Sequence, residues 1–172
     1  MQERFGAVTL KGKPLTAIGP VLAVGDAAPE VTLNPKGFDG RTRLLESTAG
    51  KPRLINVIPS IGTGICDAQT RRFNQEAASL GDGVVIVTVS ADLPFHLAEW
   101  CAAKGIDRVV TLSDHYDMAF GEAYGTHIKE LRVEQRAVFI VDADGLVRYV
   151  EYVPEIAQHP DYDKALAAVR AL

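Results

Sequence analysis

Cys66 lies where a predicted strand gives way to a predicted helix. The apolar residues 54–58 predict a buried strand and residues 67–80 predict a helix, and the segment between them holds one proline and two glycines that let the backbone turn sharply. The cysteine therefore falls in the first turn of the helix, where unpaired backbone N–H groups and the helix dipole stabilise an anion. A thiol in this position ionises more readily, and the thiolate is the reactive form. The alternative is a small buried hydrophobic side chain that happens to begin a helix.

Two other residues are candidates for stabilising a thiolate at this position. Thr63 places a hydroxyl in the same turn, where it either hydrogen-bonds the sulfur or a bound oxygen, or acts as an ordinary helix N-cap. Arg136 precedes the apolar residues 137–141, which predict a strand. Its guanidinium either reaches the sulfur and orients an anionic transition state, or is a solvated charge at the end of that strand. Arg71 is a weaker candidate, because an arginine within a helix is generally a surface residue with a buried stem.

Cys101 is the second thiol of the chain and lies on a predicted helix, residues 94–104. Peroxide converts a thiolate to a sulfenic acid, with which a second thiol condenses to form a disulfide. The alternative is a core cysteine, which the neighbouring Trp100 makes plausible. The spacing from Cys66 excludes a Cys-x-x-Cys exchange couple within one helical turn.

Other kinds of site find no support in the sequence. The glycine-rich turn has neither the lysine nor the spacing of a phosphate-binding loop, and the carboxylates are too scattered for paired acid–base hydrolysis. The histidines have no metal-ligand spacing with one another or with the cysteines, so we expect neither a metal nor a cofactor. They are His96, His115, His127 and His159.

The composition is that of an ordinary soluble globular protein. The chain has 172 residues, 47% hydrophobic and 23% charged, and a net charge of −4, so we expect a single domain, residues 1–172, with no nucleic-acid or membrane partner. No apolar run approaches the ~20 residues that span a bilayer, and the N-terminus has no secretory signal. Two cysteines do not make a disulfide scaffold, so a cytoplasmic location is expected.

The order of predicted elements indicates the fold class. Residues 1–19 contain a predicted β-hairpin, as an extension to the rest of the domain. A strand, helix, strand, helix order follows from residue 53 onward, and then come a short strand, a short helix at 116–124, a hairpin and a terminal helix at 161–172. This is the order of an α/β thioredoxin-like fold, with a central mixed sheet and helices on both of its faces.

At these residues the sequence resembles a known family. Residues 59–66, Pro-Ser-Ile-Gly-Thr-Gly-Ile-Cys, resemble the peroxidatic segment of peroxiredoxins, and most closely that of the bacterial thiol peroxidase subgroup. Residues 90–101 are similar to the resolving-cysteine region of that subgroup, residues 136–138 to the segment with its second active-site arginine, and residues 160–162 to the start of its last helix. The similarity spans nearly the whole chain, and Pro-x-x-x-Thr-x-x-Cys is specific when it lies between a strand and a helix.

The resemblance implies a role for each candidate residue. Cys66 would be the peroxidatic cysteine, Thr63 and Arg136 its activating partners, and Pro59 the residue that shields it from bulk water. Cys101 would be the resolving cysteine within the same chain. The resemblance also implies a hydroperoxide substrate, thioredoxin as the reductant and a homodimer.

Two points are left open at this level. Gly62 departs from the subgroup, which usually has aspartate before the threonine, and this affects the expected stiffness of the turn. A redox sensor or binding module on a thioredoxin-like scaffold is the alternative function, in which oxidation of Cys66 changes a partner interface. A structural protein with two inert cysteines is the third interpretation.

Overall fold

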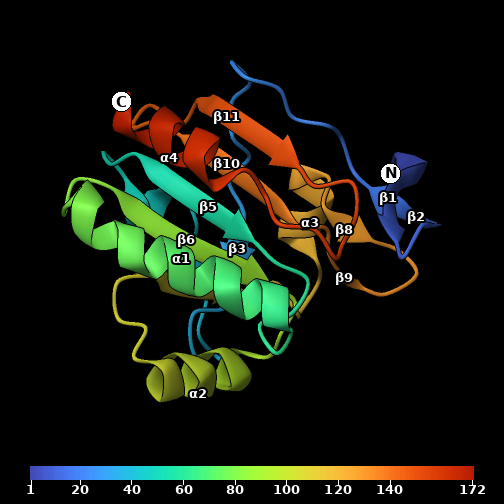
Figure 1. The fold of residues 1–172 in the computed structure, drawn as a ribbon, viewed down its shortest axis with the longest axis horizontal. Helices are drawn as coiled ribbons and strands as arrows, with labels where there is room; N and C mark the ends of the chain where they lie inside the picture. Colours follow the sequence, from blue (N-terminus) through green and yellow to red (C-terminus); the bar gives the residue numbers. More distant parts are fainter.

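A computed structural model describes residues 1–172, and its centre is a sheet of five strands: β5 (Arg53–Val57), β6 (Val85–Ser90), β7 (Val110–Ser113), β10 (Ala137–Val141) and β11 (Val147–Tyr152). The strand order is β11–β10–β5–β6–β7, and Figure 1 labels β11, β10, β5 and β6. The neighbours β5, β6 and β7 are parallel, whereas β10 is antiparallel to both β5 and β11. The C-terminal ends of β5, β6 and β7 therefore lie along one edge of the sheet.

Helices cover both faces of this sheet, as the sequence predicts. Successive strand residues point to opposite faces, so Leu54 and Ile55 belong to two different apolar clusters. The cluster with Leu54 is covered by α1 (Gly64–Leu80) and α4 (Tyr162–Arg170), which lie in front of the sheet in Figure 1. The cluster with Ile55 is covered by α3 (Ala119–Tyr124) and by N-terminal segments. These layers confirm the predicted thioredoxin-like architecture.

The remaining helix, α2 (Pro94–Lys104), packs near the beginning of α1. Its bounds match the predicted ones because both ends carry strong local signals. Proline is favoured at the first helical position, and Gly105 ends the helix in the left-handed conformation, with φ +64°. None of the helices combines the length and the apolar composition that crossing a membrane requires.

A second sheet lies at the N-terminal side of the molecule. The predicted hairpin is present as β1 (Glu3–Leu10) and β2 (Lys13–Ile18), and β2 also pairs with β8 (His127–Ile128), which pairs with β9 (Val133–Glu134). The sequence analysis did not predict β8 or β9, because two-residue strands are too short to show a periodic pattern. A smaller ladder joins β3 (Thr32–Leu33) to β4 (Thr42–Arg43), followed by the 3-10 helix η1 (Glu46–Thr48).

Three predicted helices begin at other residues than expected, and the one predicted over 161–172 spans Tyr162–Arg170, with Asp161 as its N-cap. The helix predicted from residue 67 begins at Gly64, so it includes Cys66 in its first turn. The helix predicted from residue 116 begins at Ala119, because Met118 before it has a positive φ of 58°. The Asp114 carboxylate accepts the backbone N–H groups of the two residues that follow Ala119, which fixes this start.

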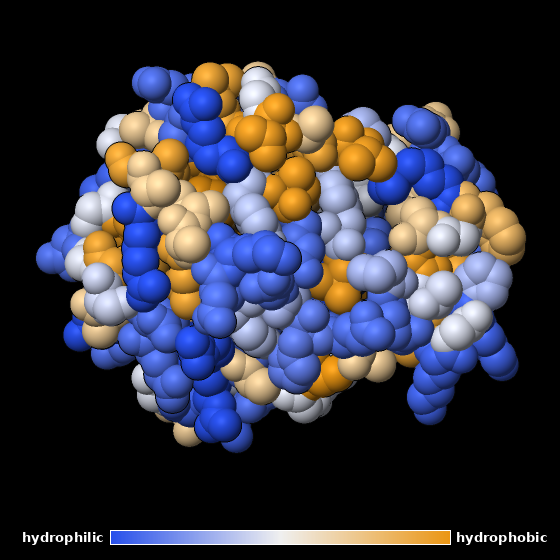
Figure 2. Space-filling model, turned by 45° about the horizontal axis from the view of Figure 1, so that its top comes forward, coloured by the Kyte–Doolittle hydropathy of each residue, from blue (hydrophilic) through white to orange (hydrophobic).

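Exposed apolar side chains come from several segments of the chain. The largest of them are Met1, Phe5, Val21, Val24, Phe38, Leu93, Phe95, Val110, Tyr116, Leu131 and Leu172. On the face drawn in Figure 2, apolar residues gather along the upper part and hydrophilic residues cover most of the middle and lower part. Isolated apolar residues are normal on a protein surface.

Candidate active site

Cys66 is fully buried in the first turn of α1. The strand β5 ends at Val57, the loop 58–62 turns the chain, and Thr63 has the extended backbone of an N-cap residue, with φ −100° and ψ 148°. The sulfur lies in a small apolar cluster with three other buried side chains, and Trp100 packs against this cluster from α2. The three are Ile58, Ile61 and Leu97. The predicted position of the thiol at the start of a helix is confirmed.

Arg136 brings a positive charge to this sulfur. Its Nη2 lies 3.4 Å from Cys66 Sγ, and its side chain is 1% exposed. The other donors bind neutral oxygens: Nη1 donates to Gln69 Oε1 at 2.6 Å, and Nε and Nη2 donate to the carbonyl of Ile156 at 3.3 and 3.0 Å. A buried guanidinium bound to neutral oxygens favours an anion beside it, because burial weakens its solvation. The guanidinium therefore faces the sulfur with no carboxylate bound to it.

Two buried amide side chains orient Arg136. Gln69 lies one helical turn after Cys66, and its Nε2 donates to Asn56 Oδ1 on β5, while Asn56 Nδ2 donates to Thr88 Oγ1 on β6 at 2.9 Å. These contacts assign the amide orientation and turn the Gln69 oxygen toward the guanidinium. The sequence analysis missed both amides. The signal for Asn56 is a polar residue inside an otherwise apolar strand, where burial requires a hydrogen-bond partner.

Thr63 makes neither the contact with the sulfur nor the N-cap hydrogen bond that the sequence analysis considered. Its hydroxyl donates to the carbonyl of Ser60 at 3.2 Å, and it makes no side-chain bond to the helix N–H groups and none to the Cys66 sulfur. Because the proton is used in this way, the lone pairs of the exposed hydroxyl are free to accept a hydrogen bond from a bound molecule. Of the predicted alternatives, the geometry favours contact with a bound oxygen.

The turn before Cys66 does not depend on a glycine at position 62. Pro59 is buried, two residues after Val57, the last residue of β5. Gly62 has no positive φ, and a Cβ there would meet its nearest atom, His96 Nε2, at an ordinary 3.7 Å, so this backbone does not require glycine. The turn is instead held by Asp92, which accepts hydrogen bonds from Ser60 and from the backbone of residue 61.

Cys101 is partly buried on α2, and both thiols are free. Burial raises the pKa of the Cys101 thiol, an effect partly offset by a hydrogen bond with Thr111, so at neutral pH this sulfur is protonated. The helix that carries it is tied to α1 through Asp67, whose carboxylate accepts the indole N–H of Trp100 at 3.2 Å and lies 3.8 Å from Lys104 Nζ.

Several other residues do not join the site. Arg71 pairs with Asp67 at 3.2 Å, as expected for a surface arginine. His127 lies near Glu122, 3.8 Å away, and burial lowers its pKa. No group of three or more histidine, cysteine or acidic side chains is arranged to hold a metal ion.

Comparison with known proteins gives a consistent result. Residues 23–166 match the Redoxin family. The chain is 54% identical to a thiol peroxidase of Bacillus subtilis, covering 96% of this chain and 97% of that one, and 52% identical to a thiol peroxidase of Halalkalibacterium halodurans, covering 97% and 99%. Among solved structures, a peroxiredoxin-like protein from Aquifex aeolicus superposes with a TM-score of 0.86 at 35% identity, covering 99% of each chain.

Proposed function

This chain belongs to the redoxin family and is a thiol peroxidase of the peroxiredoxin type, and from that premise we propose that Cys66 is its peroxidatic cysteine. The observation that supports this assignment most directly is the 3.4 Å contact between the sulfur and the buried guanidinium of Arg136. A permanent positive charge at that distance stabilises a thiolate and the negative charge that develops on oxygen during its attack.

In the first step, the Cys66 thiolate attacks the terminal oxygen of a hydroperoxide. An S–O bond forms, the O–O bond breaks, and the departing oxygen takes a proton to become an alcohol or, from hydrogen peroxide, water. Thr63 accepts a hydrogen bond from the peroxide O–H, because its own proton is donated to the carbonyl of Ser60. Arg136 stabilises the charge that spreads over sulfur and oxygens. Pro59, buried beside the turn, shields the site from bulk water.

In the second step, the Cys101 thiol attacks the sulfur of the Cys66 sulfenic acid. An S–S bond forms, and the hydroxyl leaves as water with the thiol proton. A disulfide needs Cα atoms within about 7 Å of each other. The two cysteines lie on different helices, so we expect one helix end to unwind locally, releasing α2 from its contacts with Asp67. Thioredoxin then reduces the disulfide through its own dithiol and restores both thiols.

Peroxide consumption driven by thioredoxin and its reductase tests these roles. Cys66→Ser is expected to abolish turnover. Cys101→Ser is expected to lose thioredoxin-dependent turnover but to keep a single rapid reaction with peroxide, because the sulfenic acid still forms. Full activity of Cys66→Ser would end the proposal, and full thioredoxin-dependent turnover of Cys101→Ser would remove the resolving role. Slow turnover of the wild type, together with an oxidation-dependent partner, would favour a redox sensor instead.

We extend the proposal to the assembly and location of the enzyme. A homodimer follows from the resemblance to the thiol peroxidase subgroup, and sedimentation velocity at micromolar concentration tests it. A cytoplasmic location follows from the proposed reductant, because compartments with active thioredoxin keep thiols reduced. Fractionation of the source cells tests that location.

A further inference from the structure

Asp92 is outside the set of residues assigned above, yet its carboxylate receives three hydrogen bonds at the edge of the site. Oδ1 accepts the hydroxyl of Ser60 at 2.7 Å. Oδ2 accepts the backbone N–H of Ile61 at 2.7 Å and the hydroxyl of Ser90 at 2.9 Å. Two of these donors, Ser60 and Ile61, belong to the loop before Cys66. They precede Asp92 by 32 and 31 residues in the sequence.

These two donors are the residues that shape the surroundings of the sulfur. The side chain of Ile61 is fully buried and packs in the cluster that contains Cys66. The carbonyl of Ser60 accepts both the backbone N–H and the hydroxyl of Thr63, each at 3.2 Å. A carboxylate that fixes Ser60 therefore also fixes the direction of the Thr63 hydroxyl, which we assign to the peroxide.

Asp92 is itself firmly anchored to the sheet. Its backbone carbonyl accepts the hydroxyl of Ser113 at the end of β7, and its backbone N–H donates to Ser90 Oγ at the end of β6, at 3.2 Å. The loop before Cys66 is thus tied through one side chain to the C-terminal ends of two neighbouring strands.

We propose that Asp92 is a positioning residue of the peroxidase reaction: it holds Ser60 and Ile61 so that Thr63 and the wall of the cysteine pocket are in place for the peroxide. This inference rests on the proposed role of Cys66. A carboxylate suits the task because it accepts several donors on two oxygens, whereas an asparagine has one acceptor oxygen and would turn N–H donors toward existing donors.

The positioning role and a simple charge effect predict opposite results for Asp92→Asn. Removing a negative charge from the neighbourhood of a thiolate favours the thiolate and would speed the reaction at acidic pH. Releasing the loop misplaces Thr63 and slows the reaction, and a displacement of about 1 Å costs roughly a hundredfold in rate. The sign of the change therefore distinguishes the two.

The experiment measures the second-order rate constant of the reduced enzyme with hydrogen peroxide, by competition with a heme peroxidase for limiting peroxide. We expect Asp92→Asn to lower this constant by about 10- to 100-fold. Ser60→Ala, which removes one of the two loop contacts, is expected to lower it less, by about threefold or more. Asp82→Asn is the matched control, because it makes the same charge change at an exposed turn at the other end of β6.

Alkylation of Cys66 by iodoacetamide across a pH series provides the second measurement. Because iodoacetamide needs no contact with Thr63, its limiting rate at high pH is expected not to fall in Asp92→Asn. Equal losses with peroxide and iodoacetamide would overturn the inference, because they would show general damage to the nucleophile.

An unchanged or faster reaction of Asp92→Asn with peroxide would also overturn the positioning role of Asp92. If that variant fails to fold, Ser60→Ala decides by the same criterion. Cys66→Ser in the same assay separates the two proposals. A wild-type rate for Cys66→Ser would refute the assignment of Cys66, whereas an inactive Cys66→Ser with an unaffected Asp92→Asn would refute only the positioning role.

Discussion

Arg53 and Arg136 are two buried arginines at opposite ends of the same strand pair. Val141 of β10 pairs with Arg53, whereas Arg136 directly precedes Ala137, which pairs with Val57 at the other end of β5. Both side chains are almost inaccessible, 2% and 1% exposed. The two ends differ in what the guanidinium binds, and on this difference we base the proposal that Arg136, and not Arg53, acts in the reaction.

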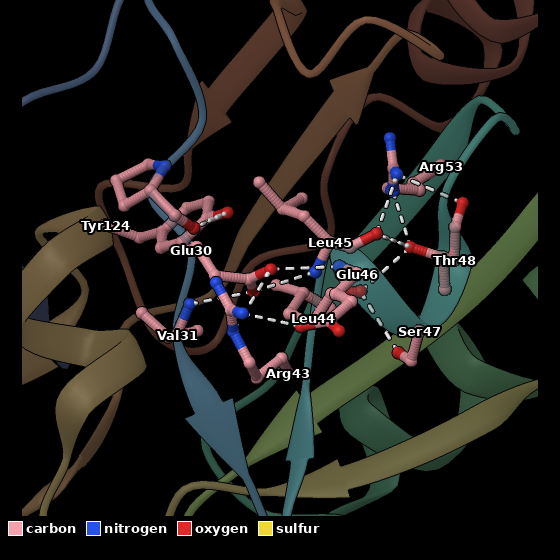
Figure 3. Close-up of polar contacts among 11 residues, drawn as sticks. Glu30, Val31, Arg43, Leu44, Leu45, Glu46, Ser47, Thr48, Arg53 and Tyr124 are labelled. Atoms are coloured by element: carbon pink, nitrogen blue, oxygen red, sulfur yellow. Dashed lines mark hydrogen bonds and ion pairs between the residues drawn. The ribbon is translucent and has the colours of Figure 1, made fainter.

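Arg53 is satisfied entirely by neutral oxygens. It donates to the hydroxyl and the carbonyl of Thr48 and to the carbonyls of Leu45 and Asp142, so it closes the loop around η1 onto the sheet; Figure 3 draws its contacts with Leu45 and Thr48. The start of η1 is held from the other side by the Glu30 carboxylate, which accepts the backbone N–H groups of Leu45 and Glu46 (Figure 3). Burial is the main effect on Arg53 and lowers its pKa, but the guanidinium stays charged.

Arg136 instead keeps one donor for a sulfur. Gln69 and the carbonyl of Ile156 hold the guanidinium in place, and Nη2 is shared between that carbonyl and Cys66. Both arginines stabilise the folded chain, but only at this end does the guanidinium hydrogen-bond a side chain that can become an anion. Burial and charge alone therefore do not identify a catalytic arginine, and the partner of the guanidinium must be known.

Replacing Arg136 by methionine tests this distinction most severely. We expect the rate constant with hydrogen peroxide to fall by about 100- to 1,000-fold, the size of the loss when one preorganised donor to a developing anion is removed. Circular dichroism is the control for folding. A loss of less than about threefold would show that the contact with Cys66 is structural only.

The matched change at the other end, Arg53→Met, is expected to act on stability. It leaves buried carbonyls without donors, so the free energy of unfolding should fall by roughly 2–4 kcal/mol in urea titrations. The rate of the folded variant with peroxide should stay within about twofold of the wild type. A large loss of rate at unchanged stability would contradict the comparison.

Glu134, two residues before Arg136, makes the free energy of unfolding depend on pH. It is fully buried, and burial and the nearby Asp114 raise its pKa well above the usual value, so the folded chain keeps this proton to a higher pH than the unfolded chain does. Above about pH 4.3 the unfolded state loses this proton while the folded state keeps it. The contribution of Glu134 to the free energy of unfolding is therefore complete below that pH. It falls as pH rises, by roughly 1.4 kcal/mol per unit, until the folded pKa is reached.

Glu134→Gln keeps a neutral side chain of the same shape and should remove this contribution. Urea titrations between pH 5 and 8 should show a flatter pH dependence for the variant, with the largest gain over the wild type at the alkaline end. Identical slopes would show that Glu134 does not hold the proton.

The smallest effect is expected at Gly62, in the turn between β5 and α1. Its backbone is not in the left-handed region and a Cβ has room, so Gly62→Ala should raise the free energy of unfolding by about 0.4–1 kcal/mol through the unfolded state. The rate with peroxide should change by less than about twofold. A strong loss of rate would mean that the turn needs the freedom of glycine.

The sequence predicted the elements that carry strong local signals. The strand at 137–141 and the helix at 94–104 agree with the structure residue by residue, because one is a continuous apolar run and the other is bounded by proline and glycine. The strands β8 and β9 were missed, because pairing with the N-terminal hairpin forms them rather than their own two-residue sequences.

The site was predictable in its residue types and less so in its contacts. The strand-to-helix turn places Cys66 by local rules alone, whereas its contact with Arg136 joins residues 70 apart in the sequence. Gln69, Asn56 and Asp92 could not be assigned from the sequence, because a buried amide or carboxylate is identified by its partners.

The contact between Trp100 and Asp67 has a practical consequence. Trp100 is the single tryptophan of the chain; it adjoins Cys101 and donates its indole N–H to the residue that follows Cys66. We expect a movement that brings the two sulfurs together to break this bond and to change the surroundings of the indole. The unlabelled enzyme therefore carries its own fluorescent reporter, and stopped-flow emission can time oxidation and reduction separately, without a coupled assay.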